Sequence, residues 1–208
     1  MKKGVFITFE GADGCGKSTQ IGLIKKYLDD NNIENILTLE PGATELGRDL
    51  RKILLHYEKP VSNVAETYLY LADRAQHVEF EIKPALDSGI VVLCDRYIDS
   101  TLAYQGYARK QNLETIKKLN EIAIDGVVPD LTIVFDIDSE VAQKRLCGEK
   151  DRLEKEGLEF HRALRYGYLE ISKQEPNRVK VINADDTIEN IHKKVLELVK
   201  KYLWKKFF

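Results

Sequence analysis

The sequence contains few cysteines and no long apolar run. Its three cysteines, Cys15, Cys94 and Cys147, are odd in number and far apart. They have neither the spacing of a metal site nor that of a disulfide framework, so we expect a reduced chain in the cytoplasm. No apolar stretch approaches the length of a membrane span, and Lys2-Lys3-Gly4 leads directly into a short strand. We therefore expect neither a membrane segment nor a signal peptide.

A basic excess is also absent. The chain has 32 Lys and Arg against 34 Asp and Glu, a formal net charge of −2. This balance argues against nucleic acid or an anionic membrane as a partner. No Asn is followed by Lys, so the Asn-Lys-x-Asp guanine motif of a regulatory GTPase is missing. The length of 208 residues suits one α/β domain that spans residues 1–208.

What the sequence does contain is a complete G-x-x-x-x-G-K-[ST] phosphate loop at residues 11–18. In such a loop the backbone N–H groups surround nucleotide phosphates, Lys17 reaches the β and γ phosphates, and the Ser18 hydroxyl can bind Mg²⁺. The predicted ATP phosphate site comprises Gly11, Ala12, Asp13, Gly14, Cys15, Gly16, Lys17, Ser18 and Thr19.

The hydrophobic pattern predicts an α/β fold. Five short apolar runs are predicted as strands, at residues 5–9, 35–39, 90–94, 131–135 and 179–182. Helical spacing predicts helices after the phosphate loop and at about 46–55, 63–86, 113–124, 139–146, 158–174 and 187–207. Asn63 and Glu66 have the spacing of a capping box. The expected architecture is a phosphate-loop NTPase-type three-layer fold, with a five-stranded parallel sheet and helices on both faces.

A second chemical feature follows the third predicted strand. Asp95 ends this strand, as a Walker-B acid does in phosphate-loop enzymes. With Ser18 it is the candidate Mg²⁺ site, and we expect it to act through bound water. The alternative is a strand-end Asp in a turn, but the phosphate loop favours the metal site.

Several stretches together resemble the thymidylate kinase (dTMP kinase) family. They occur in family order over almost the whole chain. The matching stretches are Phe9–Thr19, Glu40–Thr44, Ala72–His77, Asp95–Tyr97, Ser100–Gly106, Pro129–Thr132 and Asp151–Glu154. The resemblance implies ATP-dependent phosphorylation of dTMP to dTDP for dTTP synthesis, with Mg²⁺, in a homodimer.

The resemblance also implies roles for residues of a dTMP site. Asp13 matches the acid that binds the sugar 3′-hydroxyl, Tyr70 the aromatic that stacks on thymine, and Tyr104 the ring beside C2′. Arg51 and Arg96 match the arginines on the acceptor phosphate, and two Arg forks suit a dianion. Arg74 and Gln105 match residues that bind the base. The expected set is Asp13, Arg51, Tyr70, Arg74, Arg96, Ser100, Tyr104 and Gln105.

The charged segment at about 145–157 resembles the lid of the family. One subgroup has a catalytic Arg in the phosphate loop, but this chain has Gly14 there. The subgroup with glycine supplies the arginine from the lid, and Arg152 is our candidate, with Arg145 or Lys150 as alternatives. The predicted catalytic residues are Lys17, Arg96 and Arg152. A charged mobile loop without a catalytic arginine remains the alternative for this segment.

Two further classes compete with this hypothesis. A non-catalytic nucleotide-binding module has no need of Arg51, Asp95 and Arg96 together. A kinase with an alcohol acceptor would use a general base near the site, and no His stands out as one.

Overall fold

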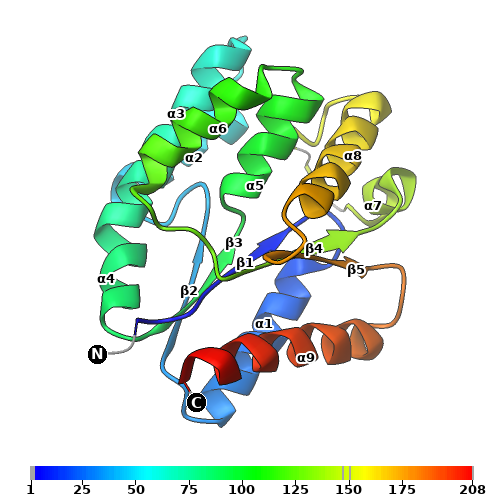
Figure 1. Cartoon of the computed structure of the whole chain (residues 1–208). Coiled ribbons are helices and arrows are strands. Elements are labelled where there is room, and N and C mark those ends of the chain that lie inside the picture. Colours follow the sequence, from blue (N-terminus) through cyan, green and yellow to red (C-terminus); the bar gives the residue numbers. More distant parts are fainter. Residues whose placement is uncertain (1–2, 147, 150, 208) are drawn as a thin grey trace.

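Five parallel strands form the centre of the molecule, which is described here by a computed structural model (Figure 1). The structure describes residues 3–146, 148–149 and 151–207. The strand order is β2-β3-β1-β4-β5, which confirms the predicted fold class. The strands are β1 (Phe6–Glu10), β2 (Asn35–Leu39), β3 (Val91–Asp95), β4 (Leu131–Asp136) and β5 (Val179–Asn183).

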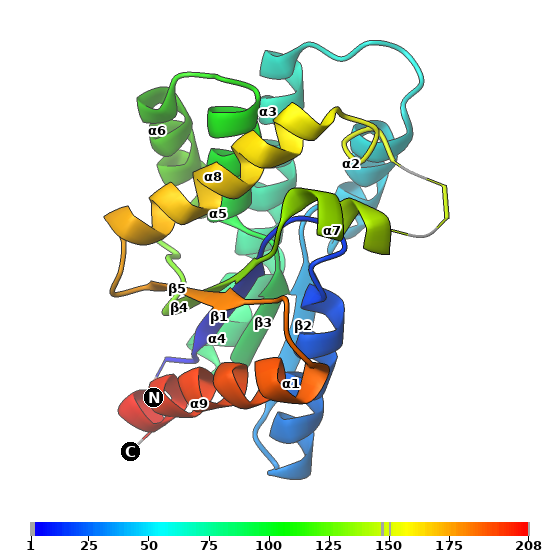
Figure 2. The same ribbon diagram turned by 90° about the vertical axis from the view of Figure 1, so that its right-hand side faces the viewer.

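Helices cover both faces of this sheet (Figures 1 and 2). Helices α1 and α9 lie on one face, where Ile24, Leu28 and Val195 pack into a shared core with β1, β3 and β4. The other face carries α3 to α6 and α8. The helical segments are α1 (Lys17–Asp30), α2 (Glu45–His56), α3 (Asn63–His77), α4 (Lys83–Asp87), α5 (Ile98–Thr101), α6 (Leu113–Ile124), α7 (Ser139–Arg145), α8 (Leu158–Gln174) and α9 (Ile188–Phe207), with π-helical turns η1 (Val78–Ile82) and η2 (Leu102–Ala108).

Burial explains which strands are central. Every residue of β1 is buried, because β1 lies between β3 and β4 and both of its faces are covered by helices. β2 and β5 lie at the edges and keep exposed residues such as Leu37 and Val181. Near their carboxyl ends, Phe9 of β1 and Leu39 of β2 both pair with Asp95 of β3. The segments that follow these strands therefore meet at one edge of the sheet, where open α/β sheets bind ligands.

Three local predictions need correction. The helix predicted over 63–86 is interrupted by the π-helical turn η1. The helical stretch formed by α5 and η2 was not predicted, because its buried face combines polar and aromatic residues and lacks a simple apolar period. The capping box is wrong: Ser62 is the N-cap of α3 and accepts from the Ala65 amide, which leaves the Glu66 carboxylate for other partners.

The structure bears on the cysteines and on the possibility of a membrane-spanning helix. Cys15 and Cys94 are buried free thiols, and Cys147 lies outside the described residues. Within the part of the chain that the structure describes, none of the helices combines the length and apolar character needed to cross a membrane.

Candidate functional site

The phosphate loop joins the central strand β1 to helix α1. Gly11, Gly14 and Gly16 have φ angles of 136°, 80° and 92°, which residues with a side chain rarely adopt. Helix α1 begins at Lys17, and no described side chain caps its N-terminus. The amide groups of its first turn are therefore available to an anion, as they are where proteins bind phosphate.

The side chains of the loop are arranged around this anion position. The ammonium group of Lys17 lies 3.1 Å from the Gly11 carbonyl oxygen and 3.3 Å from that of Ala12. The lysine is therefore folded over the loop and buried, with a weak contact of 3.8 Å to the Asp13 carboxylate. Cys15 is buried beneath the loop, and Ser18 and Thr19 are exposed on the first turn of α1.

Arg96 extends from the end of β3 to the phosphate loop. Its backbone φ of 71° is unusual for a residue other than glycine, and such conformations concentrate at functional sites. Its guanidinium donates to the Asp13 carboxylate at 2.5 Å and to the Gly11 carbonyl at 3.0 Å, and it lies over the Tyr104 ring. Burial alone would raise the pKa of Asp13, but Arg96 and Lys17 hold it below its usual range. Asp13 is therefore a permanent hydrogen-bond acceptor.

Glu10 supports Arg96 from the buried end of β1. It accepts hydrogen bonds from the Tyr97 amide at 2.7 Å, the Ser100 hydroxyl at 2.5 Å and the Tyr168 hydroxyl at 3.1 Å. Ser100 and Tyr168 also contact Arg96, at 3.4 and 3.3 Å. Desolvation by complete burial, helped by Asp99, raises the pKa of Glu10 to about 7.

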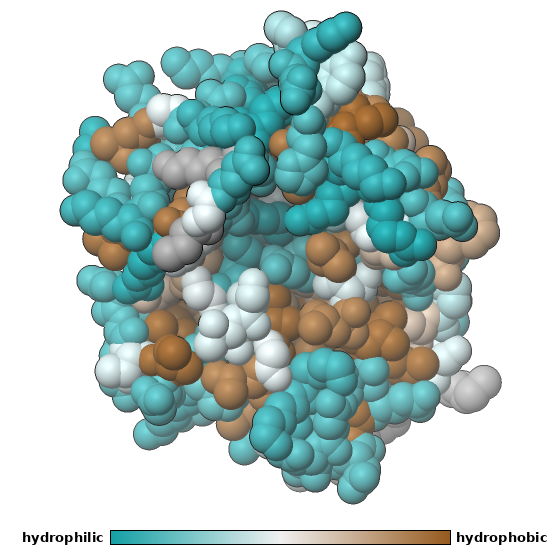
Figure 3. Space-filling view, turned by 180° about the vertical axis from the view of Figure 1, so that it is seen from behind, coloured by the Kyte–Doolittle hydropathy of each residue, from teal (hydrophilic) through white to brown (hydrophobic). Residues whose placement is uncertain are grey.

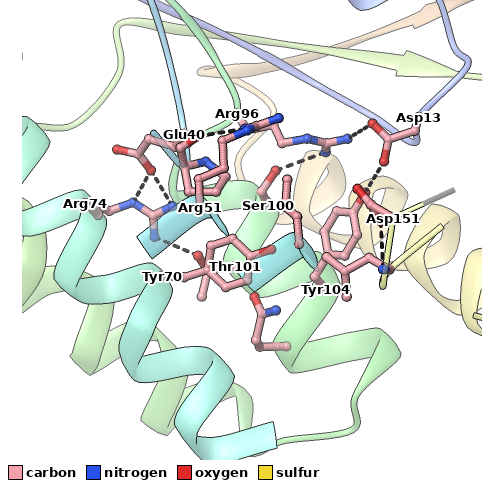
Figure 4. A pocket seen from close by; sticks show the side chains of 14 residues that line it. Asp13, Glu40, Arg51, Tyr70, Arg74, Arg96, Ser100, Thr101, Tyr104 and Asp151 are labelled. Carbon is pink, nitrogen blue, oxygen red and sulfur yellow. Dashed lines mark hydrogen bonds and ion pairs between the residues drawn. The ribbon is translucent and has the colours of Figure 1, made fainter. Parts of the chain in front are cut away.

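A cavity opens beside the phosphate loop, and all eight residues predicted for the dTMP site line it (Figure 4). Six further residues complete the lining. They are Glu40, Pro41, Leu55, Thr101, Asp151 and Leu153. All of these except Leu55 belong to the stretches that match the family. The sequence therefore contained a signal for them, although the resemblance was not used to give them a role. Seen from behind, the molecule has a hollow near its centre with mainly hydrophilic walls (Figure 3).

At one end of the cavity, Arg74 is held by a buried network (Figure 4). Its guanidinium pairs with Glu40 at 2.7 Å and donates to Thr101 and Asn120, each at 2.7 Å. Since an arginine has five N–H donors and four are engaged here, one remains for a ligand. His77 binds the other oxygen of Glu40, so it belongs to this support rather than to the cavity wall.

The other cavity residues come from distant segments. Tyr70 lies one helical turn before Arg74 on α3, and Tyr104 on η2 donates to Asp13 at 3.3 Å. Gln105 is buried and donates to Glu66 at 2.9 Å. Arg51 on α2 donates to the Pro41 carbonyl at 2.7 Å. The fold thus places three arginines, three acids, an amide and two aromatic rings around one space.

Asp95 has the surroundings expected of a metal ligand. One of its carboxylate oxygens, Oδ1, is buried and has no hydrogen-bond partner among the described residues. A buried acceptor without a partner is uncommon and is satisfied when a cation or its bound water is present. The described residues contain no cluster of three or more His, Cys, Asp and Glu side chains that could form a protein-only metal cage.

The structure does not bring Arg152 to the phosphate loop. Its guanidinium pairs with Glu66 at 2.6 Å and donates to the Leu54 carbonyl at 2.9 Å, and Arg152 does not line the cavity described above. Arg145 donates to the Ala184 carbonyl and to Asp185. Lys150 lies outside the described residues.

The chain is similar to known proteins over nearly its whole length. The family model described as thymidylate kinase matches residues 9–195. Thymidylate kinase of Trichormus variabilis is 45% identical over 205 residues, covering 96% of this chain and 97% of the relative. That of Clostridium novyi is 44% identical over 208 residues, covering 98% and 100%. The crystal structure of thymidylate kinase from Ehrlichia chaffeensis superposes with a TM-score of 0.78 at 35% identity, covering 95% of this chain and 99% of that one.

Proposed function

The chain belongs to the thymidylate kinase family, whose members are ATP-dependent phosphotransferases that convert dTMP to dTDP. We propose how the residues of this chain carry out that reaction. The observation that carries the proposal is the cavity beside the phosphate loop, because it gathers Asp13, Arg51, Arg96 and the base-binding candidates in one space. The whole chain, residues 1–208, acts as one domain with a lid at about 145–157.

We assign the donor site to the phosphate loop. The amides of residues 11–19 bind the ATP phosphates, and Lys17 exchanges its contacts with the loop carbonyls for the β and γ phosphates. The low exposure of Lys17 strengthens its charge interaction with a bound anion.

The acceptor site is the cavity itself. Arg51 and Arg96 bind the dTMP phosphate, and Ser100 lies beside Arg96. Arg74, through its remaining N–H, and Gln105 bind the base, while Tyr70 stacks on it. Asp13 accepts from the 3′-hydroxyl, and Tyr104 occupies the space beside C2′. Two arginine side chains suit the doubly charged phosphate of dTMP.

The reaction needs positioning and positive charge rather than a general base. The second pKa of a phosphate monoester is about 6, so the attacking oxygen is mostly ionised at neutral pH. Lys17 and Arg96, which both contact the Gly11 carbonyl of the loop, stabilise negative charge on the transferred group. Closure of the lid excludes water and limits hydrolysis of ATP.

Magnesium fits the side chains that are present. Oδ1 of Asp95, which has no partner among the described residues, would hold a water of the hydration shell of the ion, and the Ser18 hydroxyl would bind the ion directly. Bound with ATP, the ion supplies charge neutralisation on the β and γ phosphates. The contribution of Asp95 is to orient bound water from the rigid end of β3.

We propose Arg152 as the lid cation, in the subgroup with glycine in the phosphate loop. Gly14 supports this assignment, because a Cβ atom there would lie 2.4 Å from the Ala142 carbonyl oxygen of α7. A phosphate-loop arginine does not fit beneath α7 in this arrangement. In order to act, Arg152 must leave Glu66 and contact the phosphoryl group instead. Its catalytic position therefore differs from the one in the structure.

We further propose a homodimer formed through α3 and α6. Val64 and Tyr68 of α3 are 56% and 57% exposed and border a groove between the two helices. Apolar side chains with this exposure favour a partner surface. A location in the cytoplasm, where we expect the cysteines to stay reduced, is part of this proposal.

A coupled ADP-release assay tests the substrate assignment. The purified chain is supplied with ATP, Mg²⁺ and one of seven monophosphates: dTMP, dUMP, dCMP, dGMP, AMP, CMP or UMP. We expect the highest kcat/KM with dTMP. Equal turnover of dTMP and AMP would contradict the acceptor site described above.

A further inference from the structure

Glu66 is a fully buried carboxylate that joins three separate segments of the chain. It lies in the first turns of α3 and is 0% exposed. Its Oε1 accepts from the Gln105 amide at 2.9 Å, and its Oε2 pairs with Arg152 at 2.6 Å. Arg109, which follows η2, adds two longer contacts of 3.4 Å. The N-terminus of α3 is capped by Ser62, so helix capping does not explain this carboxylate.

One side of this cluster belongs to the acceptor cavity. Gln105 lines the cavity and is 1% exposed. Its side-chain amide is oriented by the hydrogen bond that it donates to Glu66. Since the Gln105 nitrogen donates to Glu66, the orientation of the amide is set, and its carbonyl oxygen faces away from the carboxylate. Any ligand that binds Gln105 therefore acts on Glu66 through one hydrogen bond.

The other side belongs to the lid. Arg152 connects Glu66 to the last turn of α2, through the Leu54 carbonyl and through its own amide, which donates to Leu55. Arg109 pairs with Glu156 of the lid at 2.6 Å and lies over the Phe160 ring. The neighbours of Arg152, Asp151 and Leu153, line the acceptor cavity. The inner edge of the lid is thus a cavity wall, and Glu66 holds it in place.

We infer that Glu66 is a positioning residue that couples occupancy of the acceptor cavity to the position of the lid. This inference rests on the proposed function, because it takes the cavity as the dTMP site. The buried carboxylate is shared by an amide and two guanidinium groups, so it is either paired with these groups or unpaired. The unpaired state is unfavourable because it leaves a buried charge without a partner. When dTMP fixes Gln105, it also fixes the Glu66 oxygens that anchor Arg152. The acceptor then orders the lid before ATP closes it.

The test compares Glu66→Gln with a matched control, Glu156→Gln. Both changes remove one carboxylate from the ion pairs of the lid, but Glu156 contacts neither Gln105 nor Arg152 in the described structure. Without ATP, subtilisin cleavage within residues 145–157 is followed by mass spectrometry, with and without saturating dTMP. Calorimetry gives the Kd of dTMP and of a non-hydrolysable ATP analogue.

For the wild type, we expect dTMP to slow lid cleavage by about fivefold or more, within the usual range of coupling between sites. In Glu66→Gln this protection should vanish, and the Kd of dTMP should rise by about tenfold, while the ATP-analogue Kd changes by less than about twofold. Glu156→Gln should keep the protection even if its basal cleavage is faster. A purely structural role for Glu66 would change basal cleavage but not the dependence on dTMP.

Equal protection in Glu66→Gln and the wild type would overturn the inference, and so would an equal loss in Glu156→Gln. If Glu66→Gln does not fold, Arg152→Gln takes its place, since it leaves Glu66 with Gln105 and Arg109. Arg152→Gln should lose the dTMP-dependent protection. If the variant keeps this protection, the inference is wrong. Failure of the wild type to bind dTMP would instead refute the proposed substrate.

Discussion

Glu10 illustrates how a single buried group can make stability depend on pH. It lies directly before the phosphate loop, with no exposed surface, and its pKa is raised to about 7. Its burial and the nearby Asp99 favour the neutral form, whereas Ser100, Arg96 and the Tyr97 amide favour the charged form. Between pH 4.5 and 7 the folded protein therefore holds a proton that the unfolded chain has released. Stability falls as the pH rises through this window.

The first prediction follows from this decrease of stability with rising pH. Glu10→Gln has no proton to lose, so its free energy of unfolding relative to the wild type should increase between about pH 5 and 7.5 and then stay constant. A shift of this size corresponds to a total change of about 3 kcal/mol, most of which falls between pH 5 and 8. Urea unfolding at pH 5, 6, 7 and 8 measures it. A difference that is independent of pH would show that Glu10 is ionised throughout.

At the scale of elements, the phosphate loop and α7 are in direct contact at Gly14. Gly14 and Gly16 both have positive φ, but only Gly14 has a backbone atom of a neighbouring element near its missing side chain. In the described structure, a Cβ atom at Gly16 would have no heavy atom within 4 Å. The two glycines therefore separate the cost of backbone conformation from that of a steric clash.

The second prediction uses this pair. Gly16→Ala carries the conformational cost alone, roughly 1–2 kcal/mol. Gly14→Ala also forces α7 to move away from the loop, so its Tm without nucleotide should be lower than that of Gly16→Ala by about 3 °C or more. Thermal unfolding of both variants gives the comparison. The same Tm for the two would mean that α7 accommodates the methyl group at no cost.

The lid is the second element whose position bears on activity. Arg152 pairs with Glu66 in the structure, and its proposed contact with the phosphoryl group forms only after closure. An interaction made only in the transition state affects kcat and leaves ground-state binding of the substrate nearly unchanged.

The third prediction is therefore a split in the kinetic constants. Arg152→Ala should lower kcat by about 10²–10³-fold, by analogy with arginine fingers, with little change in the Kd of dTMP. Arg152→Lys should recover only part of the loss, because lysine lacks the planar fork. Steady-state kinetics with calorimetry tests both variants. Wild-type kcat in Arg152→Ala would transfer the role to Arg145 or Lys150, or show that Lys17 and Arg96 suffice.

At the scale of the whole molecule, helices on both covered faces of the sheet carry exposed apolar residues. On the α3 side, Val64 and Tyr68 border a groove with α6. On the opposite side, α9 begins with Ile188, which is 53% exposed. The two sites have similar exposed apolar residues, but only the first is the proposed dimer face.

The fourth prediction concerns assembly. In sedimentation velocity the wild type should have twice the mass of one chain, and Tyr68→Glu should shift it to the mass of a monomer, because a charge at a packed apolar interface is not solvated. Ile188→Glu is the control and should remain dimeric. A dimer that persists in Tyr68→Glu would move the interface away from α3 and α6.

Much of the architecture and of the candidate site was predictable because it depends on neighbours along the chain. Short apolar runs predicted all five strands, and the glycine spacing of residues 11–18 predicted the loop that follows β1. The resemblance to the family also pointed to eight residues that line one cavity. Their roles toward dTMP stay predictions, since a shared cavity locates side chains without identifying the ligand.

The sequence by itself determined the strands and the phosphate loop, because hydrophobic periodicity and motif spacing are local properties. The candidate residues of the dTMP site came from the resemblance to the family. Only the tertiary structure decided which of these side chains face one another. It paired Arg74 with Glu40 and turned residues 98–108 into a helical wall of the cavity. It also left Oδ1 of Asp95 without a hydrogen-bond partner in the part of the chain that the structure describes. It also placed Arg152 on Glu66, a residue whose spacing had suggested only a helix cap. These partners come from segments dozens of residues apart, so their pairing depends on packing that no local pattern contains.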